Sequence, residues 1–235
     1  MYGGGEEPFK RHVLSRPVFK VAYQNRLREI RDLLFNREQA GQLIDECAAI
    51  IADSAGGPSM VDADRAKWDY HPAMAGGGKA GQGLFYQAAL SKDFRGMVQL
   101  MKYYVKTRGA WIDANLLADG NIPATPTVSQ IGTTDSPGSE LKFRCSDFSG
   151  NGAFAAMAWR AGEVVESGAT TSKSKPQPYE ITPVWQSAEY AVFNSDITVP
   201  PNVLKAGHTY RVRARMKDGS EHWSHWSAPA QFTVH

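Results

Sequence analysis

The pattern of hydrophobic and polar positions changes its period once along the chain. Before residue 118 the apolar residues recur at helical spacing, and after residue 126 they alternate with polar residues, as in half-buried strands. We therefore predict an α-then-β fold in which a helical subdomain precedes an antiparallel β-sandwich. The strands of the sandwich are expected near residues 127–131, 140–146, 153–160, 179–185, 196–199, 210–216 and 231–234.

The first predicted helix has two chemically different faces. Ser15 is its expected cap, and Pro17 suits the first turn. We expect one face to be buried and the other to be solvated and crossed by salt bridges. The apolar face contains Phe19, Ala22, Tyr23, Leu27, Ile30, Leu33 and Leu34, and the polar face contains Arg26, Arg28, Glu29, Arg31 and Asp32. Further helices are expected from Asn36, near residues 60–68, and from about residue 91.

A short linker is predicted between the two halves. Residues 118–126 contain a glycine and two prolines among small polar residues, a composition that ends a helix and stiffens the chain. The predicted domains are therefore 1–117 and 127–235. A net charge of +2 gives no reason to expect a nucleic-acid partner. No apolar run reaches the ~18 residues that a membrane span requires.

The two cysteines, Cys47 and Cys145, each lie on an apolar stripe. We expect both to be buried free thiols, because free cysteine packs as a small hydrophobic residue. The sequence leaves a disulfide between them open, and two cysteines do not identify the redox compartment.

Two stretches invite a chemical interpretation. Carboxylates and an imidazole at Asp62, Asp64, Asp69 and His71 suit a divalent ion, but the glycine and distal glutamate of an EF-hand loop are missing. Lys79 lies among glycines at 75–83, yet no Ser or Thr follows it as in a phosphate-binding loop. We therefore predict no metal, no cofactor and no catalytic residue. The enzymatic alternative is an unrecognised active site formed by these three aspartates and the histidine.

The last two strands carry the most specific pattern in the chain. Tyr210, Val212, Ala214 and Met216 alternate with Arg211, Arg213 and Arg215. Asp218-Gly219 then provides a turn, and the segment W-S-H-W-S follows at 223–227. The indoles of Trp223 and Trp226 can stack with the three guanidinium groups as a cation–π ladder, each contact contributing roughly 0.5–2 kcal/mol. We predict that this ladder locks the last two strands together; a receptor-like recognition surface is the alternative.

This W-S-x-W-S segment, with the strand Y-R-V-R-A-R before it, resembles the end of a fibronectin type III domain of the kind found in cytokine receptors. Leu204, Gly207 and Tyr210 resemble the tyrosine corner of such sandwiches. That resemblance implies that the Tyr210 hydroxyl bonds to upstream backbone. It bears on the fold and does not identify a function.

The helical half carries a second resemblance. Residues 9–36 and 93–113 are similar to the C-terminal helical end of the CotH spore-coat kinase family. There the pattern P-x-F-x-x-x-Y-x-x-R-L-x-E-L precedes a Leu-Ile-Asp helix. The matching positions are Leu14, Pro17, Phe19, Tyr23, Arg26, Leu27 and Glu29, then Leu43, Ile44 and Asp45. The phosphate-binding Lys, catalytic Asp and Mg²⁺ ligands of such kinases have no counterpart here, and Asp93-Phe94-Arg95 lacks the glycine of D-F-G. We carry over no catalytic residue.

The two resemblances imply the C-terminal, non-catalytic portion of a larger secreted or surface protein of the CotH-like kinase family. Bacterial members often append sandwich modules and are typically exported, which implies an extracellular or cell-surface location. The implied partners are the kinase-like domain upstream in the same parent protein and a protein or glycan bound by the sandwich. The alternative is a free-standing protein- or glycan-binding module without a kinase connection, with residues 167–178, Trp185 and Tyr190 as contacts.

Overall fold

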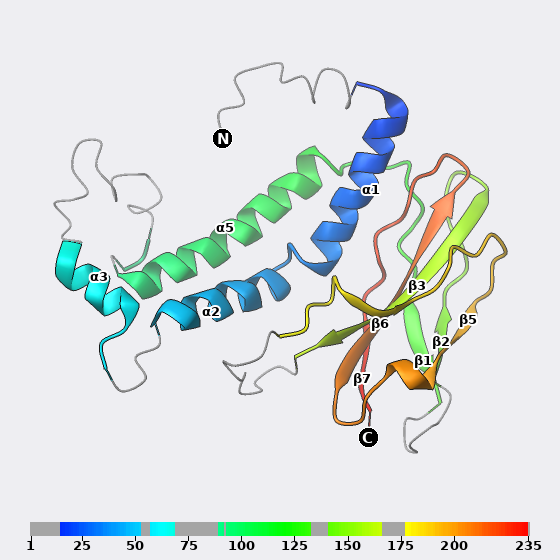
Figure 1. The fold of residues 1–235 in the computed structure, drawn as a ribbon. Coiled ribbons are helices and arrows are strands. Elements are labelled where there is room, and N and C mark those ends of the chain that lie inside the picture. The colour runs from blue at the N-terminus through cyan, green and yellow to red at the C-terminus, as the bar shows by residue number, and fades with distance from the viewer. Residues whose placement is uncertain are drawn as a thin grey trace. The chain divides into compact units, whose positions relative to one another are not determined.

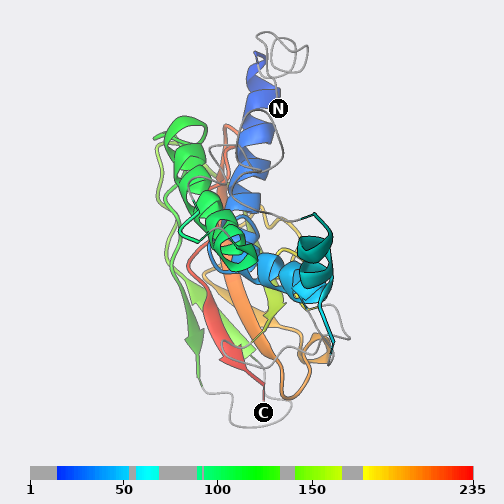
Figure 2. The ribbon, with the colours of Figure 1, turned by 90° about the vertical axis from the view of Figure 1, so that its left-hand side faces the viewer.

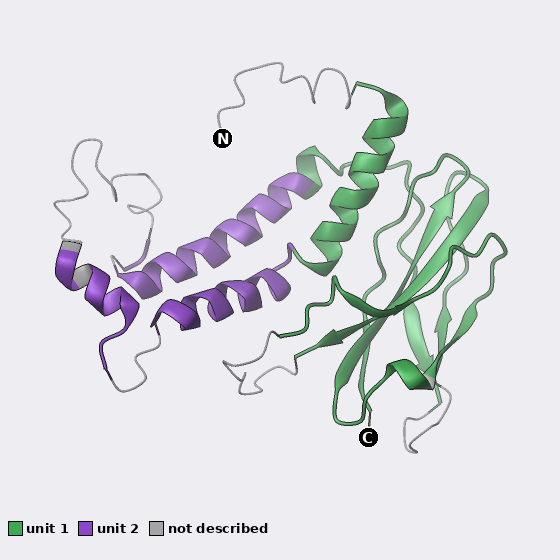
Figure 3. Cartoon of the chain, viewed as in Figure 1, with its two compact units in different colours: residues 1–34, 113–171, 177–235 green, residues 35–112, 172–176 purple. Residues whose placement is uncertain are grey.

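The computed structural model describes residues 15–52, 57–68, 89–91, 93–132, 141–165 and 177–234. Within these ranges, helices in the N-terminal part are followed by two antiparallel sheets, which confirms the predicted order of α and β structure (Figure 1). The chain forms two compact units, one of residues 1–34, 113–171 and 177–235 and one of residues 35–112 and 172–176 (Figure 3). These units differ from the predicted domain limits, because helix α1 (Pro17–Leu33) belongs to the unit that contains both sheets.

The first unit is built on two sheets. One has the strand order β1-β2-β5, from Val128–Ile131, Leu141–Cys145 and Asp196–Val199. The other has the order β4-β3-β6-β7, from Pro183–Gln186, Phe154–Val164, Thr209–Asp218 and Ala230–Thr233. All neighbouring strands pair antiparallel. Each predicted strand segment overlaps one of these strands, so the alternation of apolar and polar residues located the strands correctly.

One hydrophobic core lies between the two sheets. In β2 the residues alternate between buried and exposed, and the predicted inward residues Leu141, Phe143 and Cys145 are the buried ones. The alternate residues of β6 are buried in the same cluster, as are those of β3 and one residue of β7. These residues are Tyr210, Val212, Ala214 and Met216 of β6, Met157, Trp159 and Ala161 of β3, and Phe232 of β7.

The outer face of the four-stranded sheet is also covered, which the sequence did not predict. Helix α1 runs over this face (Figures 1 and 2), and its Leu33 packs in a second cluster with Ala156 and Ala158 of β3 and with Trp223 and Trp226. Strand β6 is therefore buried on both sides rather than on one. The arginines of its outer face lie in a largely dry environment.

The second unit contains helices α2 (Gln39–Ala52) and α3 (Met60–Trp68) and most of α5 (Phe94–Asn115). Asn36 caps α2, since its Oδ1 accepts from the N–H groups of Glu38 and Gln39 at 3.0 and 2.9 Å. Ser15 does not cap α1: Arg16 holds the N-cap position there, without a side-chain cap bond. An exposed ion pair joins Lys102 of α5 to Asp45 of α2.

The cysteine prediction holds for one residue and fails for the other. Both cysteines are free; Cys145 is buried in the sandwich core, whereas Cys47 on α2 is exposed. Leu43 and Ile50 on the same stripe of α2 are also exposed, at 42% and 68%. An apolar stripe predicts burial only where another element covers it, and the stripe alone does not show whether one does.

Candidate functional site

Two serines hold the segment 223–227 against strand β6. The N–H groups of Ser224 and Ser227 donate to the carbonyl oxygens of Met216 and Ala214 at 2.8 and 2.9 Å. Their hydroxyl oxygens accept from the N–H groups of the same two residues at 3.1 and 3.2 Å. Each W-S pair thus satisfies one residue of β6 on the edge away from β3, beyond the residues that pair with β7. This explains why serine follows each tryptophan.

The tryptophans that precede these serines form a stack with three cations, which we call the ladder. The guanidinium of Arg215 lies 4.3 Å from the Trp223 ring centroid and 4.5 Å from that of Trp226. Lys217 lies over the other side of the stack at 5.2 Å from Trp223, and Arg160 of β3 lies 5.4 Å from Trp226. Because these groups are largely removed from water, each close cation–π contact is worth about 1–2 kcal/mol.

The other two predicted arginines lie elsewhere. Arg211 and Arg213 both bind the carboxylate of Glu180, which is only 1% exposed. The backbone carbonyl of Glu180 also accepts from Arg160. Of the three arginines expected in the ladder, the structure places only Arg215 between the indoles. Sequence reasoning missed the role of Glu180, although the residue lies within the predicted strand at 179–185, because its arginine partners are more than thirty positions away along the chain.

Helix α1 binds the ladder segment through Asn25, Arg28 and Asp32, a set we call the seam. Asn25 Oδ1 accepts from the Trp223 N–H at 3.0 Å, and Arg28 Nη1 donates to the Trp223 carbonyl at 3.3 Å. Asp32 Oδ2 accepts from the Trp226 N–H at 2.8 Å. The other oxygen of Asp32 lies 2.9 Å from His225 Nδ1. These three residues recur at helical spacing, so they lie on one face of α1, and this face forms hydrogen bonds with the backbone of the W-S-H-W segment.

The polar face of α1 was expected to be solvated, but the structure shows that three of its charged residues are largely buried. Arg28 is 1% exposed, and the side chains of Arg31 and Asp32 are each 16% exposed. Arg31 forms a bidentate pair with Asp113, at 2.8 and 2.6 Å. Charged residues at helical spacing predict that a helix has a polar face. They do not show whether that face contacts water or a polar protein surface.

The electrostatics of the ladder depend on α1. Burial lowers the pKa of Arg160 to about 10, and it also lowers the pKa values of Arg28 and Arg215. Glu29 and Asp32 of α1 oppose this effect at Arg215 through their negative charges. The helix therefore supplies the countercharge that buried guanidinium groups need.

Tyr210 makes the bond that a tyrosine corner implies. Its hydroxyl oxygen accepts from the Lys205 N–H at 2.9 Å, and Gly207 in between has a φ of 77°, which suits glycine. Burial raises the pKa of the Tyr210 hydroxyl. The bond fixes the connection into β6 and, with it, the start of the strand that carries the ladder.

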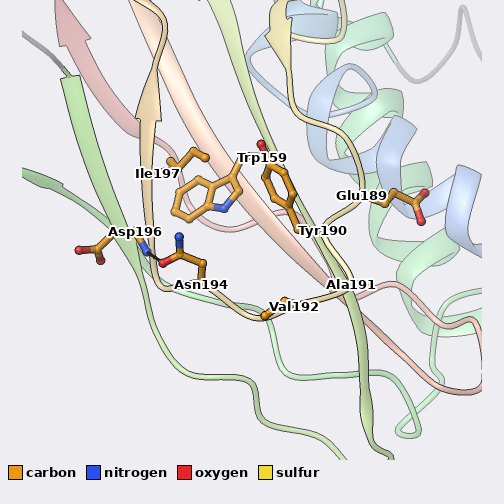
Figure 4. A pocket seen from close by; sticks show the side chains of 8 residues that line it. All are labelled: Trp159, Glu189, Tyr190, Ala191, Val192, Asn194, Asp196 and Ile197. Atoms are coloured by element: carbon orange, nitrogen blue, oxygen red, sulfur yellow. Dashed lines mark hydrogen bonds between the residues drawn. The ribbon is translucent and has the colours of Figure 1, made fainter.

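A groove opens on a different part of the sandwich, beside β5, which is the last strand in the order of its sheet (Figure 4). Its volume is about 550 Å³, and its apolar lining comes from Trp159, Tyr190, Ala191, Val192 and Ile197. Val192 is 79% exposed and Tyr190 is 38% exposed, so apolar surface is presented to the outside here. Glu189, Asn194 and Asp196 contribute the polar part of the lining.

The other candidate sites lie partly or wholly outside the described residues. Asp69, His71, the segment around Lys79 and residues 167–176 are among the residues left undescribed. Asp62 accepts from Ser59 N–H at 3.1 Å and from its hydroxyl at 2.8 Å, at the start of α3. In the part of the chain that is described, no three His, Cys, Asp or Glu side chains gather as metal ligands.

No protein-family model matches the chain, and a search of curated proteins finds no match. None of the helices in the described ranges is both long and apolar enough to cross a membrane. The geometry of the ladder, the seam and the groove is therefore the basis for any functional conclusion.

Proposed function

We propose that the chain is a non-catalytic interaction module, in which a helical scaffold holds a fibronectin III-like sandwich that binds a partner outside the helices. We further propose that it is the C-terminal portion of a secreted or surface protein of the CotH-like kinase family. The observation that carries the first proposal is the seam, because it fixes a helix onto the W-S-x-W-S face through three side chains.

The seam favours a structural role for the ladder over recognition. Trp223 and Trp226 are 7% and 3% exposed, and their backbone N–H groups are bound to Asn25 and Asp32. A ligand could not reach the indoles without displacing α1. Binding is therefore proposed at a surface that α1 leaves open, and the groove at Tyr190 and Val192 is such a surface.

The family proposal is supported by sequence pattern and by one structural link. Helix α1 lies within residues 9–36, one of the two stretches that resemble the CotH-like helical end, and it is the same helix that binds the sandwich. A helix of that family and an appended sandwich would then form one stable unit rather than two domains on a flexible tether.

Two measurements test the proposed function. First, ¹⁵N relaxation of the full chain should give the amides of α1 and of the sandwich the same rotational correlation time. Independent tumbling of α1 would contradict the scaffold. Second, calorimetry with MgATP should show no heat of binding, and a micromolar dissociation constant would contradict a non-catalytic role.

The interaction role is tested separately with immobilised peptides and glycans of known sequence. Saturable binding should be lost in Val192→Glu, which places a charge at the groove, and kept in Val18→Glu, which changes an equally exposed valine on α1. If the bound probes tolerate Val192→Glu, they bind at another surface, and if no probe binds, the interaction role is contradicted.

A further inference from the structure

The groove combines an aromatic wall with acidic ends. Figure 4 shows the rings of Trp159 and Tyr190 in the middle, with Asp196 on one side and Glu189 on the other. Trp159 belongs to the core and forms the floor, whereas the Tyr190 ring is partly open to solvent. The described lining contains two carboxylates and no lysine, arginine or histidine. A partner with positive charge is therefore complementary to it.

Each of the two carboxylates has a basic partner beside the groove. Arg144 holds Asp196 through two hydrogen bonds at 2.7 and 2.8 Å, and this lowers the pKa of Asp196 to about 2. Lys217 donates to Glu189 Oε2 at 2.9 Å, while Oε1 has no partner among the described residues. The Arg144–Asp196 pair is exposed to water, where ion pairs are weak and exchange partners readily. In the second pair the Lys217 side chain is only 14% exposed, whereas the Glu189 side chain is 55% exposed and stays open to an incoming cation.

The backbone beside the groove suits an extended peptide. Tyr190 exchanges two hydrogen bonds with Met157 at 3.0 and 2.9 Å, so the backbone groups of Glu189 and Ala191 face away from the sheet. Asn194 Oδ1 accepts from the Asp196 N–H at 3.2 Å, and its Nδ2 donors have no partner among the described residues. An extended chain across the groove can bind these groups as an added strand does.

We propose that the groove binds an extended basic peptide in which arginine or lysine side chains flank an apolar side chain. The apolar side chain lies on Tyr190 and Val192, and the two cations reach Glu189 and Asp196 at opposite ends. In an extended chain, residues two apart project to the same side, so the motif is basic-x-apolar-x-basic. This proposal rests on the interaction role of the sandwich and specifies its partner.

The test is a ¹H–¹⁵N titration of the full chain with the capped peptide Ala-Arg-Ala-Leu-Ala-Arg-Ala. Amide shifts should appear at residues 189–197. The same peptide with citrulline in place of arginine keeps the shape and removes the charge, and it should bind about tenfold more weakly. A glutamate version should not bind. Raising the salt concentration should weaken only the arginine peptide, since exposed charges are screened.

Two variants of the groove measure separately how much its charge and its aromatic surface contribute to peptide affinity. Glu189→Gln and Tyr190→Leu should each weaken binding of the arginine peptide about threefold, the first by removing a carboxylate and the second by removing the ring face. The matched control is Asp147→Asn, an exposed acid of the same sandwich outside the lining, which should leave affinity unchanged. Tyr190 is tied to β3 through its backbone, so the leucine variant keeps the fold.

Three results overturn the proposal: equal binding of the citrulline and arginine peptides, shifts confined to another surface, or no saturable shift at millimolar peptide. Shifts at another surface of the sandwich leave its interaction role intact and reject only the groove. Independent tumbling of α1, by contrast, contradicts the scaffold and leaves the groove unaffected.

Discussion

Replacing Asp32 tests whether α1 and the sandwich form one unit. In Asp32→Ala, the Trp226 N–H loses its acceptor at 2.8 Å, and Trp226 is 3% exposed. An orphaned buried N–H costs about 1–3 kcal/mol. His225 also loses its partner at 2.9 Å, but its side chain is 32% exposed and water replaces part of that bond, so this loss is about 0.5–1 kcal/mol.

The two losses add to about 1.5–4 kcal/mol of unfolding free energy. Loss of a negative charge beside the buried guanidiniums of Arg28 and Arg215 acts in the same direction. The measurement is urea unfolding followed by tryptophan fluorescence, which reports on the ladder, and by circular dichroism, which reports on the helices. We expect the midpoint to fall with an unchanged slope.

Two variants sharpen the experiment. Asp45→Ala removes another helical aspartate, in an exposed ion pair with Lys102, and should change the free energy by less than about 1 kcal/mol. Asp32→Asn keeps an oxygen acceptor for the Trp226 N–H and should lie between Asp32→Ala and the unmodified chain. If Asp32→Ala is no more harmful than Asp45→Ala, the seam does not form in solution and the argument for a single unit is wrong.

Three further predictions concern buried groups. Ser227→Ala leaves the Ala214 N–H without its hydroxyl acceptor and should lower the unfolding free energy by about 1–3 kcal/mol in the same urea assay; no change would show that the hydroxyl is dispensable. Glu180→Gln leaves two arginines of β6 facing a neutral amide and should destabilise by about 3 kcal/mol, whereas a stabilised variant would show that desolvation of the carboxylate dominates. A thiol reagent at pH 8.5 should label Cys47 at once and Cys145 only on unfolding, because Cys145 is buried and its pKa is raised to about 11; Cys47→Ser should abolish the fast phase.

The sheet elements could be predicted from the sequence because their cause is local. Alternation in β2 and β6 depends on the two-residue period of a strand, and each strand needs one buried face whatever lies around it. The turn at Asp218-Gly219 and the serines of the W-S pairs are nearly as local, since they bond to residues between 2 and 13 positions away.

The environment of charged residues could not be predicted in the same way. Arg28 and Arg26 look alike in the sequence, two positions apart on one helix, yet Arg28 is buried against the Trp223 carbonyl and Arg26 pairs with Glu29 in solvent. The difference arises from a contact about two hundred positions away along the chain. The groove is equally non-local, since β3, β5 and the segment between β4 and β5 each contribute to it.

The ladder and the seam depend on each other, because helix α1 and the sandwich share one set of buried charges. Buried cations need countercharges, and in this sandwich Glu29 and Asp32 of α1 provide part of them for Arg215. Without the helix, the indoles of Trp223 and Trp226 would face water and Leu33 would leave the cluster that covers Ala156 and Ala158. A linker marks where the chain can bend, but it does not determine which elements share a core. Substitutions on α1 are therefore expected to act on the stability of a sandwich whose last strands lie at the other end of the chain.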